Sequence, residues 1–180
     1  MHMRLEMIVL PVLQVDRAKA FYRSAGFRED LDYACGVAFR IVRFTPPGSE
    51  ASIVFGEGIT SARPGSVQGL VLGVDDIDLA REDLLTHGVA VSEVFHDSGG
   101  VFYHLVPSYL EPGPDPAGRD HASFARFSDP DGNGWVIQQE RPPAATREST
   151  SDHHGRDPWS GRRRIEGVPN ATRPAEGRSS

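Results

Sequence analysis

Four ionisable side chains bracket one long irregular stretch of the chain, residues 96–121. They are His96, Asp97, His104 and His121. Histidine is a common metal ligand and a common acid or base near neutral pH. Their spacing matches no metal-binding motif, and long loops inside compact domains are often binding loops. Two interpretations stay open: contact with a ligand at a pocket mouth, or an unconventional metal site.

A second group of candidate ligands lies in the segment DPDGNGWVIQQE, residues 129–140, which formally matches the calcium loop of an EF-hand. An EF-hand needs a helix on each side of this loop. The preceding residues 122–128 alternate apolar and polar types like a strand, and Arg-Pro-Pro follows the loop. We therefore interpret the aspartates as turn residues whose side chains bond their own backbone.

The elements that must position these residues occur twice in the chain. Val9–Phe27 and Val71–Val89 begin 62 residues apart, and six of their nineteen positions are identical. Each copy reads as a short apolar strand, an aspartate turn, an amphipathic helix and a glycine, Gly26 or Gly88, that ends the helix. Such repetition indicates two copies of one structural unit.

Periodicity extends each copy to a β-α-β-β-β module, which predicts an α+β fold of two tandem modules, 5–56 and 67–140. In module one a helix capped by Asp16 is expected among strands at Leu5–Val12, Phe27–Tyr33, Val37–Phe44 and Ser52–Phe55. In module two a helix from about Asp78 is expected among strands at Val67–Val74, Val89–Phe95, Ala122–Ser128 and Trp135–Gln139.

Composition excludes several classes of function. The net charge is −6, the acidic residues are concentrated in 1–140, and a nucleic-acid surface would need clustered cations. No apolar run is long enough to span a membrane, and no signal peptide is visible, so a cytoplasmic protein is expected. The single cysteine, Cys35, can form no intrachain disulfide. Residues 141–180 contain few large apolar side chains, which predicts a disordered Pro/Arg-rich tail.

The paired modules, the segment VDRAKAFYRSAGF in one and FSDPDGNGWVIQQ closing the other, resemble the vicinal oxygen chelate superfamily. This superfamily includes glyoxalase I, extradiol dioxygenases and bleomycin-resistance proteins. Together with the upstream segment VFHDSGGVF, the closing segment is similar to a bacterial glyoxalase-like branch. The resemblance covers about residues 1–140 and implies two half-barrel modules, with the helices outside and a small-molecule pocket enclosed by concave faces.

The resemblance also implies four strand positions that usually hold a divalent metal. Matched residue by residue, these positions are occupied by Met7, Ser52, Gly69 and Val136. None has a side chain that binds Zn, Ni, Mn or Fe in the manner of His, Glu, Asp or Cys. We therefore predict that the usual metal site is absent and that no cofactor is bound.

Strand parity predicts the residues that line the pocket. If Ile8, Leu10, Val12, Trp135 and Ile137 pack beneath the helices, the alternate residues face inward. Of Arg40 and Arg43, which have opposite parity, only one faces inward as an anion clamp, and the sequence does not decide which. The predicted ligand-pocket residues are Met7, Val9, Ser52, Val54, Val71, Val136, Gln138, His104 and His121.

Two classes of function follow. The first is a metal-free module that binds a small, partly apolar molecule, with Gln138 and Ser52 as its orienting polar groups. The alternative is a lyase, isomerase or dioxygenase of glyoxalase type that takes non-standard metal ligands from the 96–121 loop. The expected partners are a small-molecule ligand and a second copy of the chain in a homodimer, with neither nucleic acid nor membrane.

Overall fold

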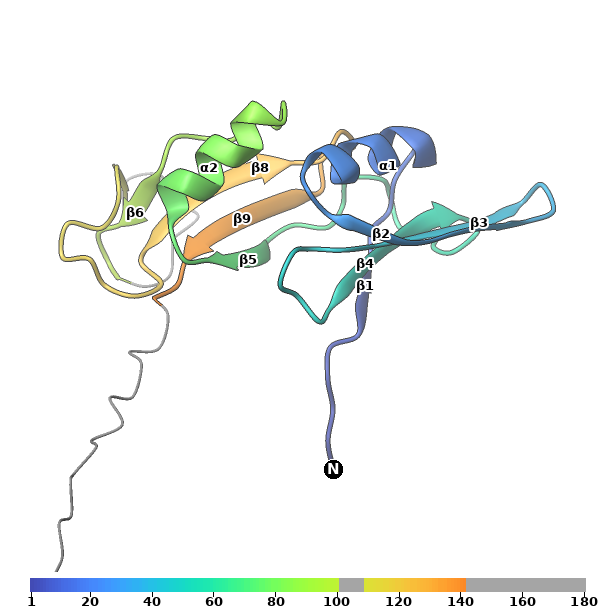
Figure 1. Cartoon of the computed structure of the whole chain (residues 1–180), viewed down its shortest axis with the longest axis horizontal. Helices are drawn as coiled ribbons and strands as arrows, with labels where there is room; N and C mark the ends of the chain where they lie inside the picture. Colours follow the sequence, from blue (N-terminus) through green and yellow to red (C-terminus); the bar gives the residue numbers. More distant parts are fainter. Residues whose placement is uncertain (101–108, 142–180) are drawn as a thin grey trace, which may run out of the picture. The chain divides into compact units, whose positions relative to one another are not determined.

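The structure is a computed structural model that describes residues 1–100 and 109–141. These residues belong to one compact unit, Met1–Ala145. Figure 1 shows two β-sheets, each with one helix lying across one of its faces. The predicted tail, residues 141–180, lies outside the described residues except for Arg141. No helix in the described part of the chain is long and apolar enough to cross a membrane.

Module one forms a four-stranded sheet in the order β1-β4-β3-β2. β1 is parallel to β4, and the other neighbouring strands are antiparallel. The elements are β1 (Met7–Val9), α1 (Val15–Ser24), β2 (Arg28–Cys35), β3 (Phe39–Thr45) and β4 (Ser52–Glu57).

Module two forms a five-stranded sheet in the order β5-β9-β8-β6-β7, and its first strand is again parallel to its last. The elements are β5 (Leu70–Val74), α2 (Ile77–Thr86), β6 (Phe95–Asp97), β7 (Leu110–Pro112), β8 (Ser123–Ser128) and β9 (Gly134–Gln139). The predicted α+β fold of two β-α-β-β-β modules is therefore confirmed, and β7 is an additional strand within the long loop.

The structure corrects several predicted boundaries. The strand after α2 begins at Phe95 rather than Val89, because the Val89 N–H bonds the Leu84 carbonyl and closes the helix end. Gln14, not Asp16, is the N-cap of α1, and its side chain makes no capping bond. α2 begins at Ile77, where Asp76 accepts a hydrogen bond from the Leu79 N–H at 3.0 Å. The glycines that follow the two helices, at 26 and 88, both have φ of +81°, as predicted.

One face of each sheet packs against the helix of its own module. In module one, Tyr22 of α1 is fully buried and packs with Phe44 of β3 and Phe55 of β4. In module two, Trp135 and Ile137 of β9 occupy the equivalent side and are also buried. Because side chains alternate along a strand, the residues between these core positions lie on the opposite face. We call this face of each sheet, which no helix in residues 1–100 and 109–141 covers, the open face.

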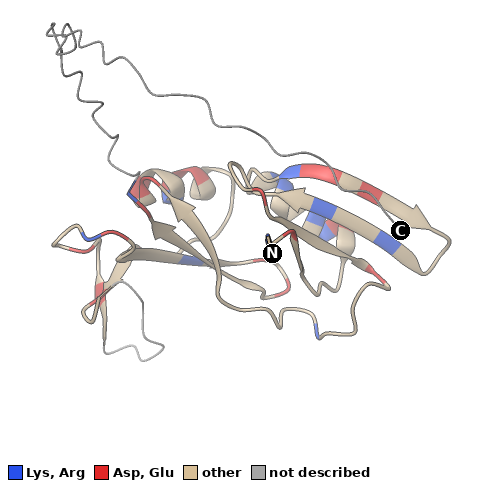
Figure 2. Ribbon diagram, turned by 90° about the horizontal axis from the view of Figure 1, so that it is seen from below, with Lys and Arg blue, Asp and Glu red and all other residues tan. Residues whose placement is uncertain are grey.

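A cross-strand charge network joins α1 to its sheet. Figure 2 shows acidic residues on β2 beside basic residues on β3. Arg40 donates to Asp32 through Nε at 2.9 Å and Nη2 at 2.8 Å, and to Asp16 of α1 at 2.8 Å. Lys19 of α1 donates to Asp32 at 2.5 Å. These hydrogen bonds, first from Arg40 and then from Lys19, hold the pKa of Asp32 well below its usual range.

A buried polar network joins the two modules at the turn between β8 and β9. The Tyr22 hydroxyl donates to Asp129 Oδ2 at 2.9 Å and accepts from Trp135 Nε1 at 3.2 Å. Asn133, which is completely buried, donates to the Pro11 carbonyl at 3.0 Å and to Asp129 Oδ2 at 2.7 Å. The segment between β1 and α1, at Pro11, and the last turn of α1, at Tyr22, are therefore both bonded to module two.

The same turn shows why its aspartates are not a calcium loop. Asp129 Oδ1 accepts from the backbone N–H groups of Asp131 and Asn133, each at 2.9 Å. The flanking elements are the strands β8 and β9, not helices. Asp129 thus bonds its own turn, as the sequence predicts.

We predict that Tyr22→Phe lowers the free energy of unfolding by about 1–3 kcal/mol, because the buried Trp135 N–H and Asp129 carboxylate each lose a partner. The measurement is urea unfolding at neutral pH. Tyr33→Phe is the matched control, since the side chain of Tyr33 is 53% exposed and should tolerate the loss. Equal unfolding midpoints for the two variants would contradict the assigned role of the network.

The Asp32 network predicts a loss of stability in acid. The pKa of the Asp32 carboxyl is lower in the folded protein than the value of about 3.9 expected in the unfolded chain. The stabilisation is therefore complete above that value and is lost progressively as the pH falls from about 4 toward the folded pKa. Asp32→Asn should therefore destabilise the protein most at pH 7 and measurably less at pH 2.5 in urea unfolding, because part of the stabilisation is already lost there. The exposed Asp75→Asn should show little effect at either pH. An Asp32→Asn effect that is the same at both pH values would contradict this assignment.

Candidate functional site

Strand register assembles the predicted pocket residues of module one into two adjacent rows on the open face. Val9 pairs with Val54, which also pairs with Arg43, and Arg43 pairs with Leu31. The next row along β1 and β4 begins with Met7, which pairs with Ser52. Met7 and Val9 are 43% and 41% exposed, whereas Ser52 and Val54 are buried at the centre of the sheet. All four predicted pocket residues of this module therefore share one face.

Module two repeats this arrangement with different side chains. Val71 pairs with Val136, which pairs with Arg126. Val71 is 53% exposed, and Val136 is buried. Because Val71 repeats Val9, the register makes Val136 the counterpart of Val54.

That register corrects the predicted set of family metal positions. Ser52 pairs with Met7, but Val136 pairs with Val71, two residues beyond Gly69, so Ser52 and Val136 are not equivalent. The error arose from matching the two turns by their glycines, although the turns differ in conformation. Within 1–100 and 109–141, no group of three or more His, Cys, Asp or Glu residues is arranged to hold a metal. The absence of the metal site stays a prediction.

The predicted loop histidines have separate surroundings in the structure. His96 Nδ1 lies 3.0 Å from the Gly113 carbonyl. His121 has φ of 60°, is about half exposed, and lies 3.1 Å from Asp120 Oδ2. His104 lies outside the described residues. The role of these histidines at a pocket mouth stays a prediction.

Gln138 has a protein partner that the sequence does not reveal. Its Nε2 donates to the His121 carbonyl at 2.7 Å, although we predicted that this amide orients the ligand. Ser52 accepts from Arg43 Nε and lies 2.8 Å from Thr45 Oγ1. The amide of Gln138 thus supports the turn before β8, and Arg43 becomes the polar group of the open face in module one.

The structure also shows which of the two arginines of β3 lies on the open face. Arg40 lies on the helix side, bonded to Asp16 and Asp32. Arg43 lies on the open face, where its Nε donates to Ser52 Oγ at 2.8 Å. Sequence parity shows that the two point in opposite directions, but the side that each one takes depends on packing against α1.

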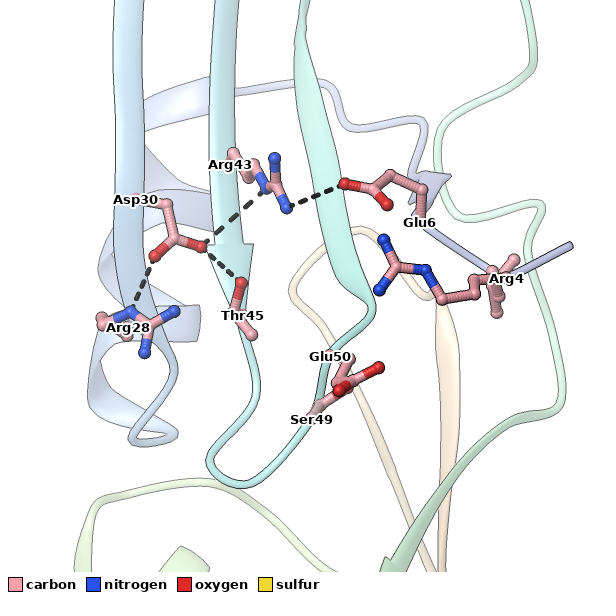
Figure 3. Close-up of a pocket in the computed structure, with 9 residues that line it drawn as sticks. Arg4, Glu6, Arg28, Asp30, Arg43, Thr45, Ser49 and Glu50 are labelled. Carbon is pink, nitrogen blue, oxygen red and sulfur yellow. Dashed lines mark hydrogen bonds and ion pairs between the residues drawn. The ribbon is translucent and has the colours of Figure 1, made fainter. Parts of the chain in front are cut away.

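A polar cavity of about 510 Å³ opens beside Arg43 (Figure 3). Asp30 projects into it from an irregularity in β2, accepting from the Thr45 hydroxyl and from Arg28 Nε. The hydrogen bond from Thr45, followed by that from Arg28, lowers the pKa of Asp30. Sequence reasoning missed this cluster because simple alternation does not anticipate the irregularity between Glu29 and Leu31. The lining residues are Arg4, Leu5, Glu6, Arg28, Asp30, Arg43, Thr45, Ser49 and Glu50.

A second cavity, of about 370 Å³, is mostly apolar and is lined by both modules. It brings Ser52 of module one together with Val71 of module two, two of the predicted pocket residues. Leu5, Ile8, Leu70 and other apolar side chains complete the wall. The described residues therefore supply a polar cavity and an apolar one, and Ser49 and Leu5 line both.

Comparison with solved structures finds similar proteins of known fold. TnmS3, an antibiotic binding protein from Streptomyces sp. CB03234, is 31% identical over 77% of this chain and 97% of its own, with a TM-score of 0.56. A glyoxalase/bleomycin resistance protein from the same organism is 30% identical over 76% of this chain and 100% of its own, with a TM-score of 0.54. The same fold is found in a superfamily member from Sphaerobacter thermophilus DSM 20745. It is 24% identical over 77% of this chain and 98% of its own, with a TM-score of 0.56.

Among curated proteins, none matches the chain. A family model, described as Glyoxalase/Bleomycin resistance protein/Dioxygenase superfamily, matches residues 4–137, which cover module one and all but the end of module two. This match confirms the resemblance inferred from the repeat and from the closing segment. The chain therefore belongs to the Glyoxalase/Bleomycin resistance protein/Dioxygenase superfamily.

Proposed function

We propose that this protein binds a small, partly apolar molecule on the open faces of its sheets and does so without the metal that the family commonly uses. The observation that carries the proposal is the set of large apolar side chains left exposed there. Met7, Val9, Leu31 and Val71 are each more than 40% exposed. Met7 and Val9 are neighbours on the open face of β1, and exposed apolar patches typically mark binding sites.

The energetic argument favours a partner for this face. Burial of apolar surface stabilises by roughly 25 cal/mol per Å², so even partial cover of several such side chains is favourable. None of the positions implied for a metal presents an ionisable group. They are Met7 and Gly69 on the opening strands and, in the corrected register, Val54 with Val136 or Ser52 with Gly134 on the closing strands. The chemistry of the face therefore suits sequestration better than catalysis at a metal. The likeness to TnmS3, described as an antibiotic binding protein, also supports binding of a small molecule.

A second copy of this chain is the protein partner that we propose for the same surface. One sheet face encloses a ligand on one side only, and a facing copy would enclose the other side. Sedimentation at increasing concentration tests this proposal. A protein that stays monomeric at millimolar concentration would contradict it, and the small-molecule proposal would then depend on one chain alone.

The binding proposal predicts that a charge on the open face abolishes binding of an apolar molecule. The neutral fluorescent probe N-phenyl-1-naphthylamine should bind wild type, and Val9→Glu and Val71→Glu should each weaken it by at least about tenfold, because a carboxylate is costly to desolvate. Leu79→Glu is the matched control, since Leu79 is 64% exposed on α2. Its binding should equal that of wild type.

The same titration, repeated with millimolar EDTA and with added zinc, separates the two classes of function. Binding should be unchanged by EDTA if no metal takes part. A zinc-dependent increase that EDTA reverses, and that His104→Ala or His121→Ala removes, would favour the metal-dependent enzyme. Equal loss of binding in Leu79→Glu and Val9→Glu would show that the probe is not on the open face.

A further inference from the structure

The cavity in Figure 3 contains a guanidinium group whose hydrogen-bonding capacity is only partly used. Arg43 Nε donates to Ser52 Oγ at 2.8 Å, which orients the planar group. Arg43 also forms ion pairs with two carboxylates, Glu6 at 3.7 Å from Nη2 and Asp30 at 3.9 Å from Nε, and both contacts are longer than a hydrogen bond. Among the described residues, the two terminal nitrogens of Arg43 thus have no hydrogen-bond partner, although its side chain is only 31% exposed.

The two neighbouring carboxylates, Asp30 and Glu6, differ in how far other groups already compensate their charge. Asp30 already accepts from the Thr45 hydroxyl and from Arg28 Nε at 2.7 Å, so its charge is compensated within the cluster. The side chain of Glu6 is 60% exposed and projects from the segment before β1. A second oxyanion arriving at Arg43 would therefore displace Glu6 rather than Asp30.

Arg43 lies within a row of apolar residues on the open face of module one. Val54 and Leu31 pair with Arg43 on either side, and Val9 continues the row across β1. In module two the counterpart Arg126 lies over the ring of Phe95, 4.5 Å from its centroid. The repeat thus places an arginine at the same point of both open faces. Both arginines line cavities, but Arg126 also lies over an aromatic ring, whereas Arg43 donates to Ser52.

We propose that Arg43 anchors a carboxylate carried by the partly apolar ligand, whose body lies against the exposed side chains of Val9 and Leu31 in the same row. A guanidinium held through Nε presents its remaining donors in a planar fork that matches a carboxylate in a bidentate manner. The inference depends on the proposed function, because it names the chemistry of the molecule that the open face of module one binds. It predicts an aromatic or alicyclic acid in preference to a neutral molecule of the same shape.

The test compares 2-naphthoate with its neutral counterpart 2-naphthamide, both at pH 7 against the full chain. Each is titrated by calorimetry and by displacement of N-phenyl-1-naphthylamine. The carboxylate should bind wild type about tenfold more tightly than the amide, in line with a charge-assisted bidentate contact. Equal affinity, or no binding of 2-naphthoate at millimolar concentration, would overturn the inference.

Variants assign the preference to Arg43. In Arg43→Met the preference should disappear while the neutral probe still binds, and Arg43→Lys should retain a part of it. Arg63→Met is the matched control, because it removes the same charge from an exposed loop position and should keep the full preference. Glu6→Gln should strengthen 2-naphthoate binding several-fold, since it removes the competing carboxylate. Persistence of the preference in folded Arg43→Met would overturn the assignment.

The two proposals fail in distinguishable ways. Binding of the neutral probe without any preference for 2-naphthoate would leave the binding function intact and remove the carboxylate anchor. If wild type does not bind the neutral probe, the proposed function is wrong. Calorimetry with 2-naphthoate alone would then show whether Arg43 still binds a carboxylate. A thermal unfolding midpoint within a few degrees of wild type identifies the variants that are folded.

Discussion

The hydrogen bond from the buried Tyr22 hydroxyl to Asp129 is the interaction on which the arrangement of the modules depends. A buried carboxylate is costly unless it is satisfied. Asp129 accepts three hydrogen bonds from its own turn, and the Tyr22 hydroxyl adds the one that joins this turn to α1 of module one. Asn133 adds a bond to the Pro11 carbonyl from the same turn. The modules are thus joined through polar groups on their helix sides, which leaves the opposite faces of both sheets available for binding.

The two faces of the module-one sheet use their arginines differently, which explains why the proposed site is mostly apolar yet contains a charge. Arg40 and Asp32 use the helix side for structural ion pairs. Arg43, three residues later on the same strand, lies on the open face with only Ser52 as its hydrogen-bonded partner among the described residues. A single strand therefore contributes both to the stability of module one and to the chemistry that we propose for its ligand.

Much of the fold follows from the sequence, because strand and helix periodicities repeat at a fixed offset and the glycines after both helices have the expected positive φ. The grouping of Met7, Val9, Ser52 and Val54 on one face also follows from parity. The polar cluster around Asp30 does not, because it depends on an irregularity in β2. The partner of Gln138 likewise depends on how the chain turns at His121, which no local pattern encodes.

The central claim is that ligand binds on the open faces, and methyl-resolved NMR tests it most directly. Addition of a saturating aromatic acid or amide should shift the methyl signals of Met7, Val9, Leu31 and Val71, which are exposed on the open faces. The signals of Val42, Ile53 and Ile137, which belong to the buried core, should move far less. Shifts concentrated in the core residues, with the open-face methyls unchanged, would contradict the account.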